Sequence, residues 1–191
     1  MRMRLAAALT LLVCALAAGC ATGQAPTQPL VLVSGLDDHG LLEVARVPLH
    51  AAPGGAVSAE VAAGTLARAL EVRGAWTRVV ALESAGPGHD HDAAEGWVGD
   101  YHLRGTLHVL AEPAHCQVPA YADAAGAPAE PLPASTQVTP TDVRHAPDGS
   151  LRVQVATVIQ PQRTAWVDRA ALSEVSAAAS ARRANGHHLD R

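Results

Sequence analysis

The stretch His89-Asp90-His91-Asp92 alternates imidazole and carboxylate side chains, which are groups that Zn²⁺ and Cu²⁺ accept as ligands. It lies in a connection between the turn-forming residues 86–88 and Gly96, and nothing nearby in the sequence holds these ligands in a fixed geometry. We therefore favour a flexible hydrophilic loop. His89 and His91 are only weak candidates for a metal site, and we expect no bound metal.

Two aromatic and three charged side chains point to a surface for non-covalent binding. Trp76 and Tyr101 would offer flat apolar faces to a peptide or a glycan. Arg78, Asp100 and Arg104 lie close to them in sequence and would pair with amine or carboxylate groups of the same ligand. The alternative is that Tyr101 only closes one end of a domain and that the charged groups are solvated.

Catalytic motifs are absent from the sequence. It contains no Gly-x-Ser-x-Gly, no His-Glu-x-x-His, no phosphate-binding glycine loop and no Cys-x-x-Cys. Cys116 as a nucleophile would need a positioned histidine, and the neighbouring His115 cannot easily turn its ring onto the thiol. We expect a protein that is not an enzyme, that needs no cofactor, and in which Cys116 is a buried or inert thiol.

The N-terminus has the pattern of an export signal. Two arginines precede an apolar run over residues 5–18, which is too short to span a bilayer. The run ends in Leu16-Ala17-Ala18-Gly19-Cys20, which resembles the bacterial lipoprotein box. The resemblance implies removal of residues 1–19, acylation of Cys20 and an extracytoplasmic location in the cell envelope, anchored to a membrane by lipid. A plain signal peptide is the alternative.

Charge and composition after this signal narrow the range of partners. Residues 20–29 are small, polar and contain proline, as is typical of a flexible tether. Removal of residues 1–19 would leave 12 arginines against 18 acidic residues. This net negative charge disfavours nucleic acid as a partner. The partner that this terminus predicts is the membrane, through the lipid anchor.

The rest of the chain contains a repeat. Val47-Pro48 recurs 71 positions later, and Glu71-Val72-Arg73 is matched at the same offset by Asp142-Val143-Arg144. Arg78-Val79 recurs 74 positions later, and Trp97-Val98 recurs 69 positions later as Trp166-Val167. The change in spacing predicts a loop in the second unit that is three residues longer. Short alternating segments between turns of glycine and proline predict strands in both units. A helix over residues 58–73 is the alternative, which Gly64 disfavours.

The first unit resembles a bacterial SH3-like domain. The resemblance rests on Ala52-Pro53-Gly54-Gly55, on the Trp-x-x-Val segment from Trp76 to Val79, and on Gly96-Trp97-Val98. It implies an all-β fold of two tandem small SH3-like β-barrels after a lipoprotein signal peptide. We expect the first barrel over residues 30–110, a degenerate second barrel over residues 111–175, and a C-terminal tail over residues 176–191.

Two further expectations concern the interior of these barrels. Trp97 and Trp166 are expected to fill the two cores, because a tryptophan buries on the order of 150–250 Å² and the chain has no phenylalanine. The proline-rich residues 127–140 are expected to form the long loop of the second barrel, because proline limits backbone pairing.

Domains of this family in bacterial envelopes commonly bind the cell wall. The resemblance therefore implies non-covalent recognition of peptidoglycan or of a cell-wall peptide. The alternative function is a non-catalytic scaffold or accessory subunit of an envelope protein complex. Exposed apolar surface around Trp76 and Tyr101 would favour the binding module, whereas a large flat patch shared by both units would favour the scaffold.

Overall fold

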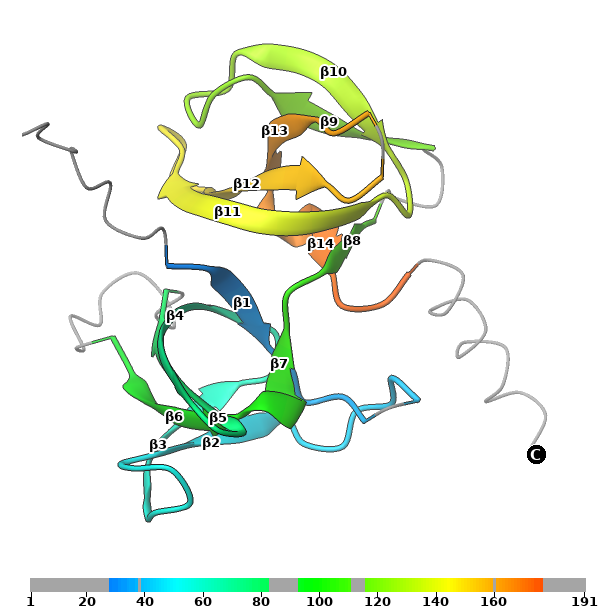
Figure 1. Cartoon of the computed structure of the whole chain (residues 1–191). Helices are drawn as coiled ribbons and strands as arrows, with labels where there is room; N and C mark the ends of the chain where they lie inside the picture. The colour runs from blue at the N-terminus through cyan, green and yellow to red at the C-terminus, as the bar shows by residue number, and fades with distance from the viewer. Residues whose placement is uncertain (1–27, 38, 83–92, 111–115, 160, 177–191) are drawn as a thin grey trace, which may run out of the picture.

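The structure of the chain is a computed structural model that describes residues 28–37, 39–82, 93–110, 116–159 and 161–176. Within these residues all regular structure is β-strand except for two three-residue 3-10 helices, so the predicted all-β class is confirmed. The strands form two sheets of seven strands each, one above the other in Figure 1. No helix in this described part is long and apolar enough to cross a membrane.

The first sheet occupies the lower half of Figure 1. Its order is β3-β2-β6-β5-β4-β1-β7, and the strands that pair are antiparallel. The helix η1 (Asp100–His102) links β6 to β7. The strands are β1 (Leu30–Val33), β2 (Arg46–His50), β3 (Val57–Ala62), β4 (Thr65–Arg73), β5 (Trp76–Ala81), β6 (Glu95–Gly99) and β7 (Leu103–Arg104).

The second sheet has the same architecture. Its order is β10-β9-β13-β12-β11-β8-β14, again with antiparallel pairing, and the helix η2 (Arg169–Ala171) links β13 to β14. The strands are β8 (Leu107–Val109), β9 (Gln117–Tyr121), β10 (Pro128–Pro133), β11 (Gln137–His145), β12 (Leu151–Thr157), β13 (Thr164–Asp168) and β14 (Leu172–Ser173).

Each strand of the first sheet has a counterpart in the second, because the two orders match position by position. Trp97 of β6 is opposite His50 of β2, and Trp166 of β13 is opposite Tyr121 of β9. The two tryptophans therefore occupy equivalent positions, 69 residues apart. The second sheet begins at β8, before the unit boundary expected at residue 110, because β8 pairs with β11 and β14.

One part of the predicted repeat is wrong, namely the difference in length between the β4–β5 hairpin and its counterpart, the β11–β12 hairpin. Arg73 pairs with Trp76, three positions later, whereas Arg144 pairs with Arg152, eight positions later. The second hairpin is therefore longer by five residues rather than three, and Arg152 corresponds to Trp76 instead of Arg78. A shift of two residues leaves every side chain on the same face of its strand, so the alternating pattern does not reveal it.

Two apolar clusters stabilise the fold, one for each sheet. The first cluster draws on strands of the first sheet alone and consists of Val33, Val47, Leu49, Val61, Ala67, Val79, Ala81 and Val98. The second cluster contains Leu107, Val109, Val118, Val153, Val155, Val167 and their neighbours, and it also includes Leu32 of β1 and Leu66 of β4. The two units therefore pack against each other through apolar side chains.

Neither tryptophan fills these clusters, which corrects the expectation for Trp97 and Trp166. Both side chains are 5% exposed, but their neighbours Val98 and Val167 are the residues that enter the cores. Because successive side chains of a strand point to opposite faces, the two tryptophans lie on the outer faces of their sheets. An arginine covers each ring: Arg73 lies over Trp97 and Arg144 over Trp166.

The proline-rich residues 127–140 are mostly strand, and the expected long loop is not formed there. They contain all of β10 and the start of β11. β10 is the edge strand of its sheet, and its register is interrupted between Ala129 and Leu132. An edge strand tolerates proline because one of its sides makes no ladder hydrogen bonds, and proline there also hinders pairing with another chain.

Candidate functional site

The residues predicted to form one binding surface lie in separate places on the first unit. Trp76 packs edge-to-face against His50, with ring centroids 5.0 Å apart and an interplanar angle of 79°. Tyr101 and Arg104 line a cavity of about 480 Å³, to which Trp76 does not contribute. The structure thus brings Tyr101 and Arg104 together and places Trp76 elsewhere, because Trp76 lies on the outer face of β5 near the turn before β3.

Arg78 and Asp100 have partners within the first unit and do not line this cavity. The Arg78 Nε atom lies 3.6 Å from a Glu95 carboxylate oxygen and 3.9 Å from a Glu71 carboxylate oxygen. Asp100 accepts a hydrogen bond of 2.8 Å from the Thr77 hydroxyl. The Arg78 contacts join β4, β5 and β6 on the outer face of the sheet, and the Asp100 contact ties η1 to β5.

The cavity beside Tyr101 lies where the end of the second unit returns to the first, and we call it the junction cavity. Its lining comes from the loop after β1, from η1 and β7, and from the residues that follow β14. The lining residues are Leu36, Asp37, Gly40, Tyr101, Arg104, Glu174 and Val175. The junction cavity therefore forms only when the two units pack against each other.

The loop after β1 forms one wall of the junction cavity and is held by its own hydrogen bonds. Leu36 and Leu42 form an isolated antiparallel bridge. One Asp37 carboxylate oxygen accepts the backbone N–H groups of His39 and Leu41, at 2.9 and 2.7 Å. An aspartate that accepts backbone N–H groups further along the chain stabilises a turn. These contacts hold Leu36, Asp37 and Gly40 in the wall of the cavity.

Arg104 presents a fixed positive charge to the junction cavity. Its Nη1 atom donates to the carbonyl oxygens of Tyr101 and Leu103, at 2.6 and 3.0 Å, and its Nη2 atom donates to the Leu36 carbonyl at 3.4 Å. A guanidinium has five N–H donors. No carboxylate oxygen of the described residues lies within 4.0 Å of this one, so its charge is held by carbonyl dipoles and is not neutralised by an ion pair.

The ring of Tyr101 forms an exposed surface next to this charge. The residue is 45% exposed, and the Arg104 guanidinium carbon lies 6.0 Å from the ring centroid. The Tyr101 hydroxyl donates to a Glu43 carboxylate oxygen at 3.1 Å, which orients the ring. The arrangement offers a flat apolar face and a cation to one ligand.

Glu174 brings a carboxylate from the second unit into the same cavity. Its Oε2 atom accepts a hydrogen bond from the hydroxyl of Ser34, which is buried directly after β1. Ser34 is itself fixed by its backbone N–H, which donates to the His102 carbonyl at 2.6 Å. The hydrogen bond therefore holds Glu174 at the junction and leaves its second oxygen for other donors.

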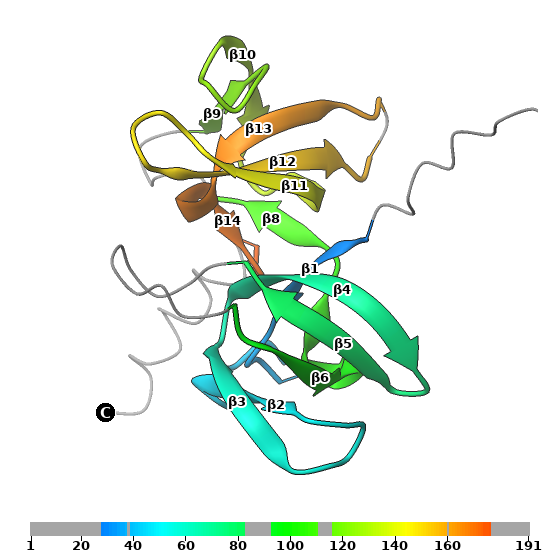
Figure 2. The same ribbon diagram turned by 90° about the vertical axis from the view of Figure 1, so that its left-hand side faces the viewer.

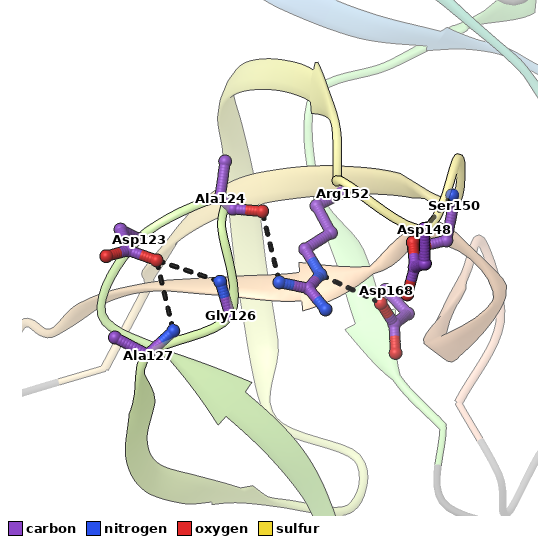
Figure 3. Close-up of polar contacts among 8 residues, drawn as sticks. All are labelled: Asp123, Ala124, Gly126, Ala127, Asp148, Ser150, Arg152 and Asp168. Atoms are coloured by element: carbon purple, nitrogen blue, oxygen red, sulfur yellow. Dashed lines mark hydrogen bonds and ion pairs between the residues drawn. The ribbon is translucent and has the colours of Figure 1, made fainter.

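The matching surface of the second unit is centred on a buried arginine. Arg152 lies 3.9 Å from the centroid of the Tyr121 ring, pairs with Asp168 at 3.3 Å and donates to the Ala124 carbonyl at 3.0 Å. Figure 3 shows the guanidinium reaching between the Asp168 carboxylate and the turn that contains Gly126. Arg152 occupies the position that Trp76 holds in the first unit, and its contacts with Tyr121, Asp168 and Ala124 all lie within the second unit.

The turn after β9 contains a carboxylate with an altered acidity. Asp123 accepts the backbone N–H groups of Ala127 and Gly126, at 3.1 and 2.8 Å (Figure 3). These hydrogen bonds, above all that from Ala127, lower the pKa of Asp123 below its ordinary value because they favour the charged form. The carboxylate therefore serves to hold the turn.

Several predicted residues lie outside the described part of the chain. They include the lipidation candidate Cys20 and the weak metal candidates His89 and His91. Among the residues that the structure does describe, no group of three or more histidine, cysteine or acidic side chains could hold a metal ion. Cys116 is described, and it is an exposed free thiol rather than a buried one.

Asp37 and Glu174 belong to the junction cavity but are not among the residues predicted from the sequence. Ser34 and Glu174 are 140 positions apart, so no local spacing indicates their contact. A signal for Asp37 exists in the Asp-Asp-His-Gly turn sequence that begins there, which indicates the turn but not the cavity. The site is thus a product of how the two units pack.

No protein-family model matches the chain, and no curated protein matches it. Among solved structures, the chain is similar to NlpC1 from Trichomonas vaginalis, with 14% sequence identity and a TM-score of 0.31. The similarity covers 76% of this chain and 45% of the NlpC1 chain, so this chain spans less than half the length of that protein.

Proposed function

We propose that the chain is a lipid-anchored binding module of the cell envelope that recognises peptidoglycan or a cell-wall peptide without catalysing a reaction. Tyr101 and Arg104 are the residues to which we assign ligand contact. Trp76, Arg78 and Asp100 would support the fold around them, since their partners lie within the first unit.

The finer fold in this proposal is a pair of tandem SH3-like barrels. It is supported by the matching strand order of the two sheets, which lie one above the other in Figure 2, and by the two apolar clusters, one for each sheet. It is also supported by the pairing of the Trp-x-x-Val strand β5 with the Gly-Trp-Val strand β6. These are the motifs on which the resemblance to SH3-like domains rests.

The proposed anchor is Cys20, acylated after removal of residues 1–19. The first sheet starts at Leu30, so the tether of residues 20–29 would span at most roughly 35 Å when fully extended. Both units would then stay near the membrane surface, within reach of the cell wall. Globomycin-sensitive processing and metabolic labelling with palmitate, both lost in a Cys20→Ala variant, would test this part of the proposal.

One observation carries the proposed binding function: the Arg104 guanidinium has no carboxylate partner among the described residues, and it lies beside the exposed face of Tyr101 in a cavity of about 480 Å³. An aromatic face and an unneutralised cation form a suitable pair for a peptide that carries carboxylates. The exposed side chains of Leu41 and Leu42 add apolar surface on the adjoining loop, as expected for a binding module.

A sedimentation assay tests this function. The full chain, purified in detergent, is mixed with insoluble purified peptidoglycan, and the bound fraction is compared with that of a Tyr101→Ala variant. We expect retention of the wild-type protein and a loss of about tenfold in affinity for the variant, since removal of a contacting aromatic ring costs on the order of 1–2 kcal/mol.

Val72→Ala is the matched control, because Val72 is an exposed residue of the first unit that lies outside the cavity. Its retention should equal that of the wild-type protein. If the wild-type protein is not retained on peptidoglycan, wall binding is wrong and a scaffold role in an envelope complex becomes the better assignment.

A further inference from the structure

The junction cavity contains charges of both signs that do not neutralise one another. Arg104 and Glu174 both line it, and so does Asp37. No oxygen of either carboxylate lies within 4.0 Å of the Arg104 guanidinium. Oppositely charged groups that line one cavity without pairing are suited to a ligand that carries both complementary charges.

The donors left on Arg104 define the anionic end of that ligand. Both Nη1 donors and one Nη2 donor are taken by the carbonyls of Tyr101, Leu103 and Leu36. The Nε–H and the second Nη2–H remain without an acceptor among the described residues. Two N–H groups of one guanidinium are what a carboxylate accepts in a bidentate pair. This end of the cavity therefore fits a carboxylate.

The oxygens left on Asp37 and Glu174 define the cationic end. Asp37 uses its Oδ1 atom for the turn, and among the described residues its Oδ2 atom is approached only by the His39 ring, at 3.8 Å. Glu174 uses its Oε2 atom for the Ser34 hydroxyl. Each carboxylate thus keeps one oxygen for a further donor, and an ammonium group with three N–H donors can bind both.

From this geometry we infer that the junction cavity binds a peptide end that carries a carboxylate and an ammonium group together, with Glu174 of the second unit as a specificity-determining residue. The inference rests on the proposed function and narrows its ligand to a zwitterionic peptide end. It also gives the second unit a role in binding, because Glu174 and Val175 complete the cavity.

Calorimetric titration of the full chain with three forms of one peptide tests the inference. The probes are N-acetyl-Ala-Ala-Lys with both charges, the same peptide with an acetylated lysine side chain, and the same peptide with an amidated C-terminus. We expect the first form to bind, and each capped form to bind at least about tenfold more weakly, because a charge-assisted hydrogen bond is lost.

Two variants test the ammonium-binding end and the carboxylate-binding end of the cavity separately. Glu174→Gln keeps an acceptor for Ser34 and leaves Asp37 in place, so it should discriminate against the lysine-acetylated peptide severalfold less than the wild-type protein does, while still preferring the free carboxylate over the amide. Arg104→Lys should lose most of the preference for the carboxylate, since lysine has no bidentate donor pair. Glu60→Gln is the control for removal of one negative charge, because Glu60 pairs with Arg46 on another strand pair, and it should match the wild-type protein.

The outcomes distinguish this inference from the proposed function. Retention on peptidoglycan together with equal binding, or no binding, of the three peptides overturns the zwitterionic ligand and leaves wall binding intact. If the chain discriminates among the peptides but is not retained on peptidoglycan, the assignment of the junction cavity is supported. The cell wall is then overturned as the source of its peptide ligand. If Glu174→Gln discriminates the lysine-acetylated peptide as the wild-type protein does, the role of Glu174 is wrong.

Discussion

The guanidinium carbon of Arg73 lies 5.0 Å from the centroid of the Trp97 ring on the outer face of the first sheet. The equivalent pair in the second sheet, Arg144 and Trp166, is separated by 5.5 Å. In each unit the acidic residue two positions before the arginine pairs with it, at 2.6 Å for Glu71 and 3.1 Å for Asp142. A tryptophan covered by an arginine is therefore a repeated structural element.

This pair predicts a measurable coupling in the first unit. Trp97→Ala should lower the free energy of unfolding by about 3 kcal/mol, because the ring is almost fully buried. Arg73→Ala should lower it by about 0.5–1 kcal/mol, the range of an exposed cation–π contact. Urea unfolding of both single variants and the double variant should show that Arg73→Ala has almost no effect once Trp97 is absent, whereas additive effects would contradict the contact.

Arg152 should be coupled more strongly to Tyr121 than to Asp168. The arginine side chain is 8% exposed and stacks on the Tyr121 ring, whereas the Asp168 side chain is 43% exposed. An ion pair with an exposed carboxylate contributes little to the free energy of unfolding, whereas a desolvated cation–π contact contributes up to about 2 kcal/mol. Double-mutant cycles of Arg152→Met with Tyr121→Leu and with Asp168→Asn measure the two couplings, and a larger value for Asp168 would refute this ranking.

Leu32 should stabilise the second unit although it belongs to a strand of the first sheet. It is 1% exposed and packs in the second apolar cluster. Leu32→Ala should therefore cost about 2–5 kcal/mol and accelerate amide hydrogen exchange in β11 and β12. Leu41→Ala, at an exposed position, is the control and should change stability by less than about 0.5 kcal/mol. Unchanged exchange in the second unit would show that the units are stabilised independently.

The hydrogen bonds that Asp123 accepts predict that the folded chain loses stability in acid. Its pKa in the folded chain lies below the ordinary value of 3.8 because it accepts the Ala127 and Gly126 N–H groups. The carboxylate therefore stabilises the fold above about pH 4, and this contribution is lost as the pH falls through the lowered pKa. Asp123→Asn should be less stable than the wild-type protein at pH 7, and urea unfolding should show the difference shrinking toward pH 3. A difference that does not depend on pH would contradict this role.

Much of the fold is encoded in local patterns. Alternation of apolar and polar residues predicts strands because its period of two matches the pleat, and the structure confirms an all-β chain within the described residues. The spacing between Trp97 and Trp166 matches their equivalent places in two sheets of the same order. Alignment of the two units by residue spacing nevertheless matched Arg152 with Arg78, two positions from its counterpart Trp76. The error was not visible in the sequence because a shift of two residues preserves the alternation.

The sequence by itself determined the all-β class, the repetition of one unit and which aromatic and charged side chains are available for binding. Tertiary structure alone decided that Val98 rather than Trp97 enters the core, that Trp76 is kept apart from Tyr101, and that Glu174 meets Ser34 from 140 positions away. The physical reason is that alternation is a property of neighbouring residues, whereas the assignment of a face to the core and the closure of a cavity depend on which strands pack together.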